Sequence, residues 1–432
     1  MSSTLYLSRS PAIRYASGAS LYFAQGIPKG LLNVAMPAWL ASQGVSTGAI
    51  ASYLAVIVLP WAFKLLTGPL MDRFEYRPMG WRRPWVLGAQ LGLVLSLLGL
   101  VLVKDPVSQL GLLMTLGVII NSFAATQDVA VDGMAIDLVP EAEHGRINAF
   151  MSWGKAVGWA LTAALSGVLL VKYGLAVTGV VAAIGAGIVL VAFLFVRERE
   201  GERLLPWTSG EAASRRSALP SFKAVMGDLN AVLWSRASQV VLLIMFFDGL
   251  VSGYGEALMP IAAVKLFAFT TTQWSQLVAT MGLAGAFIAL GLGPMIDRFG
   301  AKTMLLTTVT VVCLHAFLLA GTQQFWTNSS YVLVMLSAWV LLLPVTMVCV
   351  IALAMSICFS RVSATQFAVY MSMANLGASM GSKLFGSVAE YTSFAQNYAL
   401  MGALLVAMVC VTAIFRKHDN FVLATEQEPA GG

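Results

Sequence analysis

Stretches of about 20 apolar residues recur along the chain and alternate with short polar segments. A helix of that length spans the hydrocarbon core of a bilayer. The pattern predicts twelve transmembrane helices, six on each side of the longest polar segment. Their approximate ranges are 16–40, 47–70, 84–103, 110–137, 147–171, 175–196, 237–262, 273–296, 301–320, 331–357, 364–389 and 394–415. We therefore expect an all-α membrane protein.

The polar segments divide the chain into five expected regions. These are a cytoplasmic N-terminus (1–15), an N-terminal six-helix half (16–196), a cytoplasmic linker (197–236), a C-terminal six-helix half (237–415) and a cytoplasmic tail (416–432). We expect the tail to be disordered because it is polar and terminal. The linker between Gly201 and Met226 is expected to be flexible or to lie on the membrane surface.

Lysine and arginine fall mainly in alternate loops. Nineteen lie at the termini or in loops on the same side as the linker, whereas three lie on the opposite side, at Lys104, Lys172 and Lys265. Basic loops are enriched on the cytoplasmic side of a membrane. Both termini are therefore expected in the cytoplasm, in agreement with an even number of crossings.

Composition agrees with a multi-pass membrane protein. Hydrophobic residues make up 58% and charged residues 11% of the 432 positions, against about 25% charged residues in soluble domains. The net charge of +6 does not indicate nucleic-acid binding, because the basic residues are spread over short loops. The four cysteines lie within apolar stretches without metal-ligand spacing, so we expect neither a metal nor a cofactor.

The second half of the chain repeats motifs of the first half. Segment 68–74 (GPLMDRF) returns after 225 residues as 293–299 (GPMIDRF), while 36–37 (MP) and 154–158 (GKAVG) return after 223 residues as 259–260 (MP) and 377–381 (GASMG). Each copy has an even number of helices, so both keep the same orientation and the repeat is parallel. Two parallel six-helix halves are typical of transporters. The paired glycines in 154–158 and 377–381 are expected to be close helix-packing seams.

The Gly-x-x-x-Asp-Arg element of the repeated 68–74 segment resembles the cytoplasmic loop motif of the major facilitator superfamily. This resemblance implies the major facilitator fold with two six-helix halves. An Asp-Arg pair at a helix end suits a gate, and a structural clamp is the alternative. The expected gating residues are Asp72, Arg73, Asp297, Arg298 and Lys383. The first copy departs from the common pattern, because residues 75–81 separate the motif from Arg82 and Arg83.

Three further segments carry a narrower resemblance. Segments 21–28 (LYFAQGIP), 60–64 (PWAFK) and 127–132 (QDVAVD) resemble the AmpG-like permeases and acetyl-coenzyme A transporters, a branch that includes siderophore permeases. The resemblance implies proton-driven import of a bulky polar solute, such as an anhydromuropeptide or a siderophore. The implied partners are that small molecule, protons and the lipid bilayer. We expect a monomer in the bacterial inner membrane.

Two carboxylates, Asp128 and Asp132, interrupt the apolar stretch that begins at Leu110. Four residues apart, they share one helix face, and each costs about 2.5 to 3.5 kcal/mol at the bilayer centre. Counted along their helices, Lys64 and Lys155 reach the same depth. We hypothesise that this layer couples proton uptake to transport, since one carboxylate would exchange its proton. A fixed ion-pair brace is the alternative.

Polar side chains also recur at matching heights of the first and seventh predicted helices. At the 223-residue offset, Gln25 aligns with Asp248 and Asn33 with Glu256, beside glycines and prolines that weaken both helices. This recurrence predicts a substrate wall. The expected substrate-binding residues are Gln25, Lys29, Asn33, Gln127, Asp248 and Glu256.

The sequence allows two partners for Lys29. It could receive a carboxylate or phosphate of the solute, or it could pair with Asp248. Glu256 and Lys383 lie at similar depth and could instead close the outer side or extend to the membrane surface.

Other functions fit the sequence less closely. An exporter of drugs or metabolites and an acetyl-coenzyme A transporter are alternatives within transport. A membrane enzyme acting on lipid-linked substrates lacks support, because no His, Cys or metal cluster is present. A non-transporting sensor built on the same fold is the remaining alternative.

Overall fold

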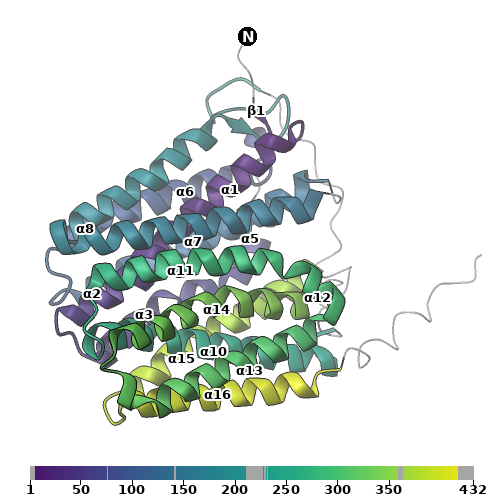
Figure 1. Ribbon diagram of the computed structural model, residues 1–432. Coiled ribbons are helices and arrows are strands. Elements are labelled where there is room, and N and C mark those ends of the chain that lie inside the picture. The colour runs from purple at the N-terminus through teal and green to yellow at the C-terminus, as the bar shows by residue number, and fades with distance from the viewer. Residues whose placement is uncertain are drawn as a thin grey trace, which may run out of the picture.

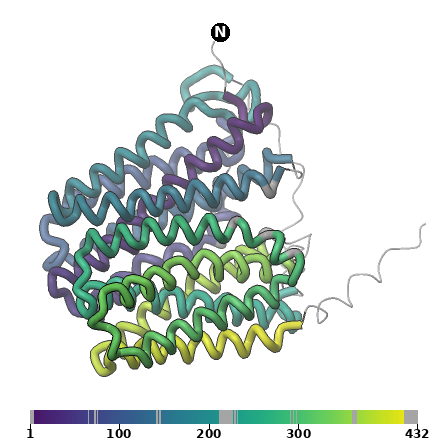
Figure 2. Tube along the Cα trace, in the orientation of Figure 1, coloured from purple at the N-terminus to yellow at the C-terminus, as the bar shows by residue number. Residues whose placement is uncertain are grey.

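Helices make up nearly all of the structure, and the longest run side by side along one direction (Figure 1). The computed structural model describes residues 5–74, 76–140, 143–210, 227, 230, 232–358 and 363–416. The helices before residue 195 gather mainly on one side of the bundle and those after residue 235 on the other (Figure 2). We call these two sets the N-terminal and C-terminal helices.

The N-terminal helices are interrupted by short turns of other helix types. They are α1 (Pro11–Pro28), η1 (Lys29–Ala35), α2 (Met36–Ser42), α3 (Thr47–Ile57), α4 (Leu59–Ala62), η2 (Lys64–Leu66), α5 (Thr67–Arg73), η3 (Arg77–Met79), α6 (Arg83–Leu98), η4 (Gly99–Leu102), α7 (Leu110–Leu138) and α8 (His144–Leu194). Of the interruptions, η1 is a π-helix and the others are 3₁₀-helices. The long α8 consists of two helices that meet at Gly174, whose φ of 77° is strained for other residues.

The C-terminal helices are longer and more regular. They are α10 (Arg236–Lys265), α11 (Thr271–Gly291), α12 (Gly293–Phe299), α13 (Ala301–Gly321), η6 (Gln323–Phe325), α14 (Ser329–Met355), α15 (Ser363–Val388) and α16 (Phe394–Ile414). Pro260 is accommodated within α10 without a break. The predicted tail beyond Arg416 and residues 211–226 of the predicted linker lie outside the described residues.

Seven helical spans of the described chain are long and apolar enough to cross a membrane. They are Arg83–Leu102, Leu110–Leu138, Arg146–Leu194, Arg236–Lys265, Ala301–Gly321, Ser329–Met355 and Phe394–Ile414. The span from Arg146 contains the break at Gly174. The first predicted crossing is divided by η1 and the second by η2, so neither forms one long regular helix. The count of twelve crossings thus stays a prediction.

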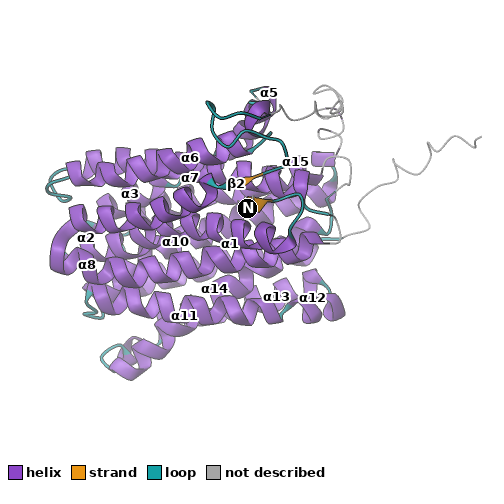
Figure 3. Ribbon diagram, turned by 90° about the horizontal axis from the view of Figure 1, so that it is seen from above, coloured by secondary structure: helices purple, strands orange, loops and turns teal. Residues whose placement is uncertain are grey.

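A short pair of strands accompanies the helices. β1 (Leu5–Tyr6) pairs in parallel with β2 (Val196–Arg197), which directly follows α8 (Figure 3). The N-terminal segment is therefore tied to the end of α8. In addition, α1 begins at Pro11, five residues before the predicted start at 16, because the side chain of Ser10 caps it.

The two glycine motifs are packing seams, as predicted. A Cβ at Gly154 or Gly158 of α8 would collide with the backbone of α1, at Ala19 and Phe23. Likewise, a Cβ at Gly377 or Gly381 of α15 would collide with the backbone of α10. Only glycine allows these close approaches. The same seam therefore occurs in both copies of the repeat and brings α8 against α1 at the depth of the charged residues.

Candidate functional site

Asp128 on α7 lies between two lysines from different elements. Its Oδ2 atom accepts a hydrogen bond from Lys64 Nζ at 2.8 Å, and Lys155 Nζ lies 3.7 Å from Oδ1. The Asp128 side chain is 4% exposed and that of Lys155 is 36% exposed. The structure thus brings together three of the four groups that were predicted to share one depth. A carboxylate buried this deeply is stabilised by two ammonium groups.

Asp132 lies one turn further along α7 and has a different environment. Its Oδ1 atom accepts a hydrogen bond from the hydroxyl of Tyr22 on α1, and its side chain is partly buried. Lys155 Nζ lies 5.3 Å from the centre of the Tyr22 ring. Of the two neighbouring carboxylates, Asp128 is therefore paired with cations and Asp132 with a neutral hydroxyl. Tyr22 was not predicted as a site residue, although it lies in the 21–28 segment that carried the family resemblance.

Trp61 joins both lysines to the rest of the layer. Its indole N–H donates to Asn121 Oδ1 on α7 at 2.8 Å. The centre of its ring lies 5.0 Å from Lys155 Nζ and 5.9 Å from Lys64 Nζ. An ammonium group at this distance from an indole ring is attracted by the ring's quadrupole. Neither Trp61 nor Asn121 was predicted as a site residue, although Trp61 lies in the 60–64 segment that carried the family resemblance.

Local backbone structure explains how Lys64 reaches Asp128. Pro60 has no N–H group, so the regular helix ends at Ile57 and resumes only as short turns. Lys64 begins the 3₁₀ turn η2 within this break. The continuous α7, in contrast, holds Asp128 and Asp132 on one face.

A second charged contact joins the N-terminal and C-terminal helices. Lys29 Nζ on η1 lies 3.4 Å from Glu256 Oε1 on α10, and Asn33 Nδ2 donates to Glu256 Oε2 at 3.4 Å. The pairing of Lys29 with Asp248, one of the two partners considered from sequence, is therefore wrong. Lys29 is half exposed and Glu256 is 29% exposed, so both remain open to solvent. Asn33 and Glu256, which match at the 223-residue offset, contact each other.

The remaining predicted substrate-binding residues are distributed differently. Gln25 is 1% exposed and Gln127 is fully buried. The amide of Gln127 donates to Gln90 Oε1 at 2.5 Å and to the Leu21 carbonyl at 3.3 Å, which places it inside the N-terminal helices. Asp248 is partly buried on α10. In this conformation, Lys29, Asn33 and Glu256 form one group, whereas Gln25 and Gln127 are closed off from solvent.

The predicted gating residues are only partly described. The side chains of Asp72, Arg73 and Asp297 lie outside the described residues, although their backbones belong to α5 and α12. Arg298 is exposed, with its guanidinium carbon 5.3 Å from the centre of the Phe299 ring. Lys383 is also exposed.

Glu198, which follows β2, holds the loop after the first Asp-Arg motif. It is 1% exposed and accepts backbone hydrogen bonds from Trp81 (2.8 Å), Arg82 (2.7 Å) and Arg83 (2.6 Å). Gly80, with a φ of 106°, makes room for this carboxylate. The loop that departs from the common family pattern is therefore fixed to the end of α8. Sequence reasoning missed Glu198, because it lies more than 110 residues from the loop.

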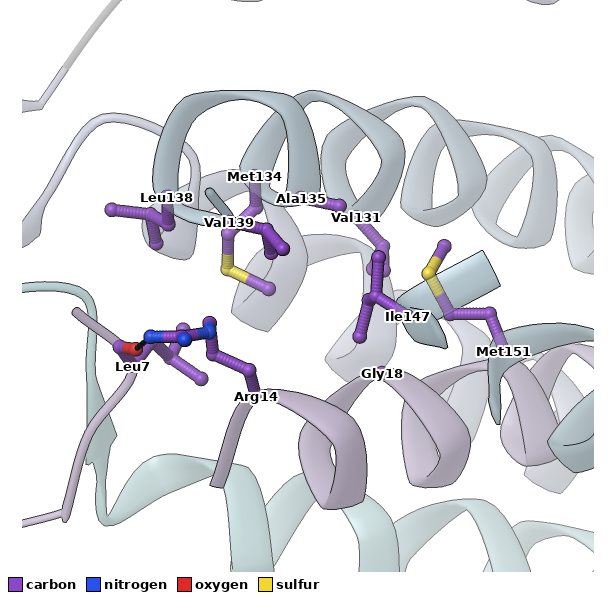
Figure 4. Close-up of a pocket in the computed structure, with 10 residues that line it drawn as sticks. All are labelled: Leu7, Arg14, Gly18, Val131, Met134, Ala135, Leu138, Val139, Ile147 and Met151. Carbon is purple, nitrogen blue, oxygen red and sulfur yellow. Dashed lines mark hydrogen bonds between the residues drawn. The ribbon is translucent and has the colours of Figure 1, made fainter. Parts of the chain in front are cut away.

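A small pocket lies between α1, α7 and α8 near the N-terminus (Figure 4). Arg14 reaches back to the Leu7 carbonyl at 3.0 Å and forms a two-oxygen ion pair with Glu143, at 2.7 and 2.8 Å. Apart from Arg14, the pocket is lined by apolar residues and Gly18. It therefore lacks the polar groups that a polar solute needs. Among the described residues, no group of three or more His, Cys, Asp or Glu could hold a metal ion.

Hydrogen bonds also join the two sets of helices at the end of the bundle that carries the α2–α3 and α10–α11 loops. Lys265 Nζ donates to the Val45 carbonyl at 2.6 Å, and Thr272 Oγ1 donates to the Gly167 carbonyl at 2.8 Å. We call this the far end, because α1 begins and α16 ends at the opposite end. The far end is thus held closed by direct contacts.

Comparison with known proteins identifies relatives of this chain. The model of the Major Facilitator Superfamily matches residues 18–382. An anhydromuropeptide permease of Escherichia coli (strain K12) is 24% identical over 433 residues, covering 95% of this chain and 82% of the permease. An uncharacterized protein of Haemophilus influenzae is 33% identical over 141 residues, and the match spans 32% of this chain and a third (33%) of that protein.

A solved structure has the same overall fold. The crystal structure of a mutant of the nucleoside transporter NupG superposes with a TM-score of 0.69 and covers 93% of this chain and 100% of that chain. Its sequence is 14% identical, so the likeness concerns the fold alone.

Proposed function

Because this chain belongs to the major facilitator superfamily, we propose that it is a proton-coupled importer of a bulky polar solute of the anhydromuropeptide type. The chain is an AmpG-like transporter and an integral, multi-pass membrane protein. Its family and fold are those of transporters rather than of enzymes. The direction of transport, the coupling ion and the solute are what we propose.

The observation that carries proton coupling is the contrast between the two carboxylates on α7. Asp128 is held by Lys64 and Lys155, whereas Asp132 is held by the Tyr22 hydroxyl. A proton arriving at Asp132 removes a negative charge next to both lysines without breaking an ion pair. The pair then shares that proton as one unit. We assign Asp132 as the entry point and Asp128 as the residue that senses the change.

The solute is proposed to bind where charged groups remain open to solvent. Lys29 and Lys155 offer ammonium groups from the N-terminal helices, while Glu256 offers a carboxylate from α10. A carboxylate-bearing solute would replace Glu256 as the partner of Lys29, since both are solvent-accessible. An anhydromuropeptide-type solute is proposed because the E. coli permease is similar over nearly the whole chain. Lys29, Asn33 and Glu256 are therefore the principal candidates for contact with it.

Transport by alternating access follows from the contacts between the two sets of helices. We propose that they act as two six-helix halves in a monomer with twelve crossings and both termini in the cytoplasm. The far end would then face outward, closed by Lys265 and Thr272. Breaking these contacts would open the site to the outside, and forming them would direct it to the cytoplasm.

Uptake by purified protein in proteoliposomes tests the proposal. An acidic outside and neutral inside should drive accumulation of a labelled anhydromuropeptide, and reversing the gradient should abolish it. A siderophore and acetyl-coenzyme A are measured in parallel to test the alternative solutes. The Asp132→Asn variant should lose gradient-driven accumulation, whereas Asp105→Asn, which changes an exposed loop carboxylate, should retain it. Uptake of anhydromuropeptide that ignores the gradient would refute proton coupling.

A further inference from the structure

The broken helix that carries Lys64 is held by α15 on both sides of its break. Around Pro60 the backbone forms tight turns, in which the Trp61 N–H bonds to the Val58 carbonyl and the Phe63 N–H to the Pro60 carbonyl. Turns of this kind leave carbonyl groups without the usual helical partner. Carbonyl groups beside such a break can accept hydrogen bonds from the side chains of a neighbouring helix.

Two side chains of α15, one turn apart, use these carbonyls. Ser379 Oγ donates to the Ala55 carbonyl at 2.7 Å, before the break. Asn375 Nδ2 donates to the Trp61 carbonyl at 3.1 Å, after the break. Ala55 belongs to the regular α3, whereas Trp61 belongs to the four-residue α4. The two bonds therefore anchor α15 to two parts of the helix that differ in their surroundings.

In the described part of the chain, the segment after the break contacts the charged groups around Asp128. The Trp61 ring lies beside both ammonium groups and its indole N–H is bonded to Asn121. Three residues later, Lys64 is bonded to Asp128. A change in the position of Lys64 would therefore move the short turn that carries the Trp61 carbonyl. Ser379, bonded to α3, has no comparable connection in the described chain.

We propose that Trp61 and Asn375 form the link that transmits the charge state of Asp128 to the C-terminal helices. The inference rests on the proposed proton coupling and adds two positioning residues to it. When the carboxylate pair takes up a proton, Lys64 loses part of its attraction to Asp128 and the turn from Leu59 to Leu66 relaxes. The Trp61 carbonyl then turns away from Asn375. This breaks the bond between α15 and α4, while the Ser379 bond still holds α15 to α3.

Few charged or titratable groups of the described chain surround the Asp128 carboxylate. Around the Asp128 carboxylate, the described charged and titratable neighbours are Lys64 from η2, Lys155 from α8, Tyr22 from α1 and Asp132 from α7 itself. Lys29 from η1 lies near enough to Lys155 to repel its ammonium group. All of them belong to the N-terminal helices. The Asn375 amide is neutral, so it responds to the position of the carbonyl rather than to the charge itself.

Hydrogen–deuterium exchange tests the link without any solute. The protein is placed in lipid nanodiscs at pH 5.5 and pH 8, and exchange is followed in peptides covering residues 59–66. Protection factors, in which each rate is corrected for the base-catalysed intrinsic exchange rate at that pH, are compared. In the wild type the protection should be several-fold lower at pH 5.5 than at pH 8, and in Asp128→Asn it should be low at both pH values. Asn375→Leu, which keeps the side-chain size but removes the donor, should also have low protection at both. Ser379→Ala, the matched control, should keep the wild-type difference between the two pH values.

Transport by the same variants separates a coupling role from a structural one. In proteoliposomes, Asn375→Leu should lose at least tenfold of the gradient-driven accumulation of anhydromuropeptide but retain exchange of solute without a gradient. Ser379→Ala should retain both. If Asn375→Leu and Ser379→Ala behave alike in exchange and transport, the link is refuted. A wild type whose transport ignores the gradient would instead refute the proposed function, and the exchange experiment would still decide the link.

Discussion

Lys64 and Asp128 form a buried ion pair, with 2.8 Å between Nζ and Oδ2, although they lie 64 residues apart in the chain. Their side chains are 12% and 4% exposed. The pair joins a broken helix to the continuous α7. Lys155 contacts the other oxygen of the same carboxylate, so Asp128 has one cationic partner on η2 and another on α8.

Replacing Lys64 by Met should destabilise the protein by about 3 kcal/mol, because it leaves a buried carboxylate with one partner. A lower melting temperature in detergent would report this loss. The double variant Lys64→Met with Asp128→Asn should recover most of it, because no unpaired charge remains. If the two losses simply add, the ion pair does not account for the stability of this layer.

The glycine seam between α8 and α1 gives a prediction with an internal control. Gly158→Val should lower stability by at least about 2 kcal/mol, because its side chain would collide with the Phe23 carbonyl. Gly187→Ala, also in α8 but with open space around it, should be neutral or slightly stabilising. Thermal melting of both variants is the measurement. Equal melting temperatures would contradict close packing at the seam.

Glu202 should make stability depend on pH. Burial raises the pKa of its carboxyl to about 7, above the ordinary value of 4.5, although the Arg199 N–H that donates to it acts in the opposite direction. Between these two values the folded state holds a proton that the unfolded state has released. Stability from this group therefore falls as pH rises from about 4.5 to about 7 and then stays constant.

The Glu202→Gln variant removes this dependence. It should be more stable than the wild type by about 2 kcal/mol at pH 8 and nearly equal to it at pH 4.5. Melting curves across this range provide the test. Glu200→Gln, which changes a mostly exposed carboxylate, should follow the wild type at every pH. A wild-type-like pH dependence in Glu202→Gln would contradict the assignment.

Lys29 should affect solute binding more than folding. Its side chain is half exposed, so Lys29→Gln should leave the melting temperature nearly unchanged. If it receives a carboxylate of the solute, the KM of uptake should rise about tenfold or more, because charge-assisted hydrogen bonds contribute about 1.5 to 3 kcal/mol. Lys172→Gln, which removes another exposed charge from a helix, is the comparison. Similar KM values for both variants and the wild type would exclude Lys29 from the solute site.

The depth of the charged residues could be calculated from the sequence alone. A helix rises a fixed distance per residue, so counting from its ends placed Lys64, Lys155 and Asp128 in one layer. The glycine seams were also predictable, because close helix packing requires small residues at regular spacing. The 223-residue offset of the repeat placed Asn33 and Glu256 at matching heights, and the structure brings them into contact.

The partners within each layer were decided by the tertiary structure. Periodicity gives the height of a side chain along its own helix, but the rotation and neighbours of each helix depend on packing over the whole bundle. This is why Lys29 meets Glu256 rather than Asp248, and why Gln127 is buried against Gln90. The contact between Asn375 and the Trp61 carbonyl likewise joins residues 314 positions apart. The sequence alone therefore determined the alternation of apolar and polar segments, the repeat and the relative height of the charges along their helices. The packed helices decided which charges and hydrogen-bonding groups meet, because those contacts depend on the relative rotation and placement of helices distant in the chain.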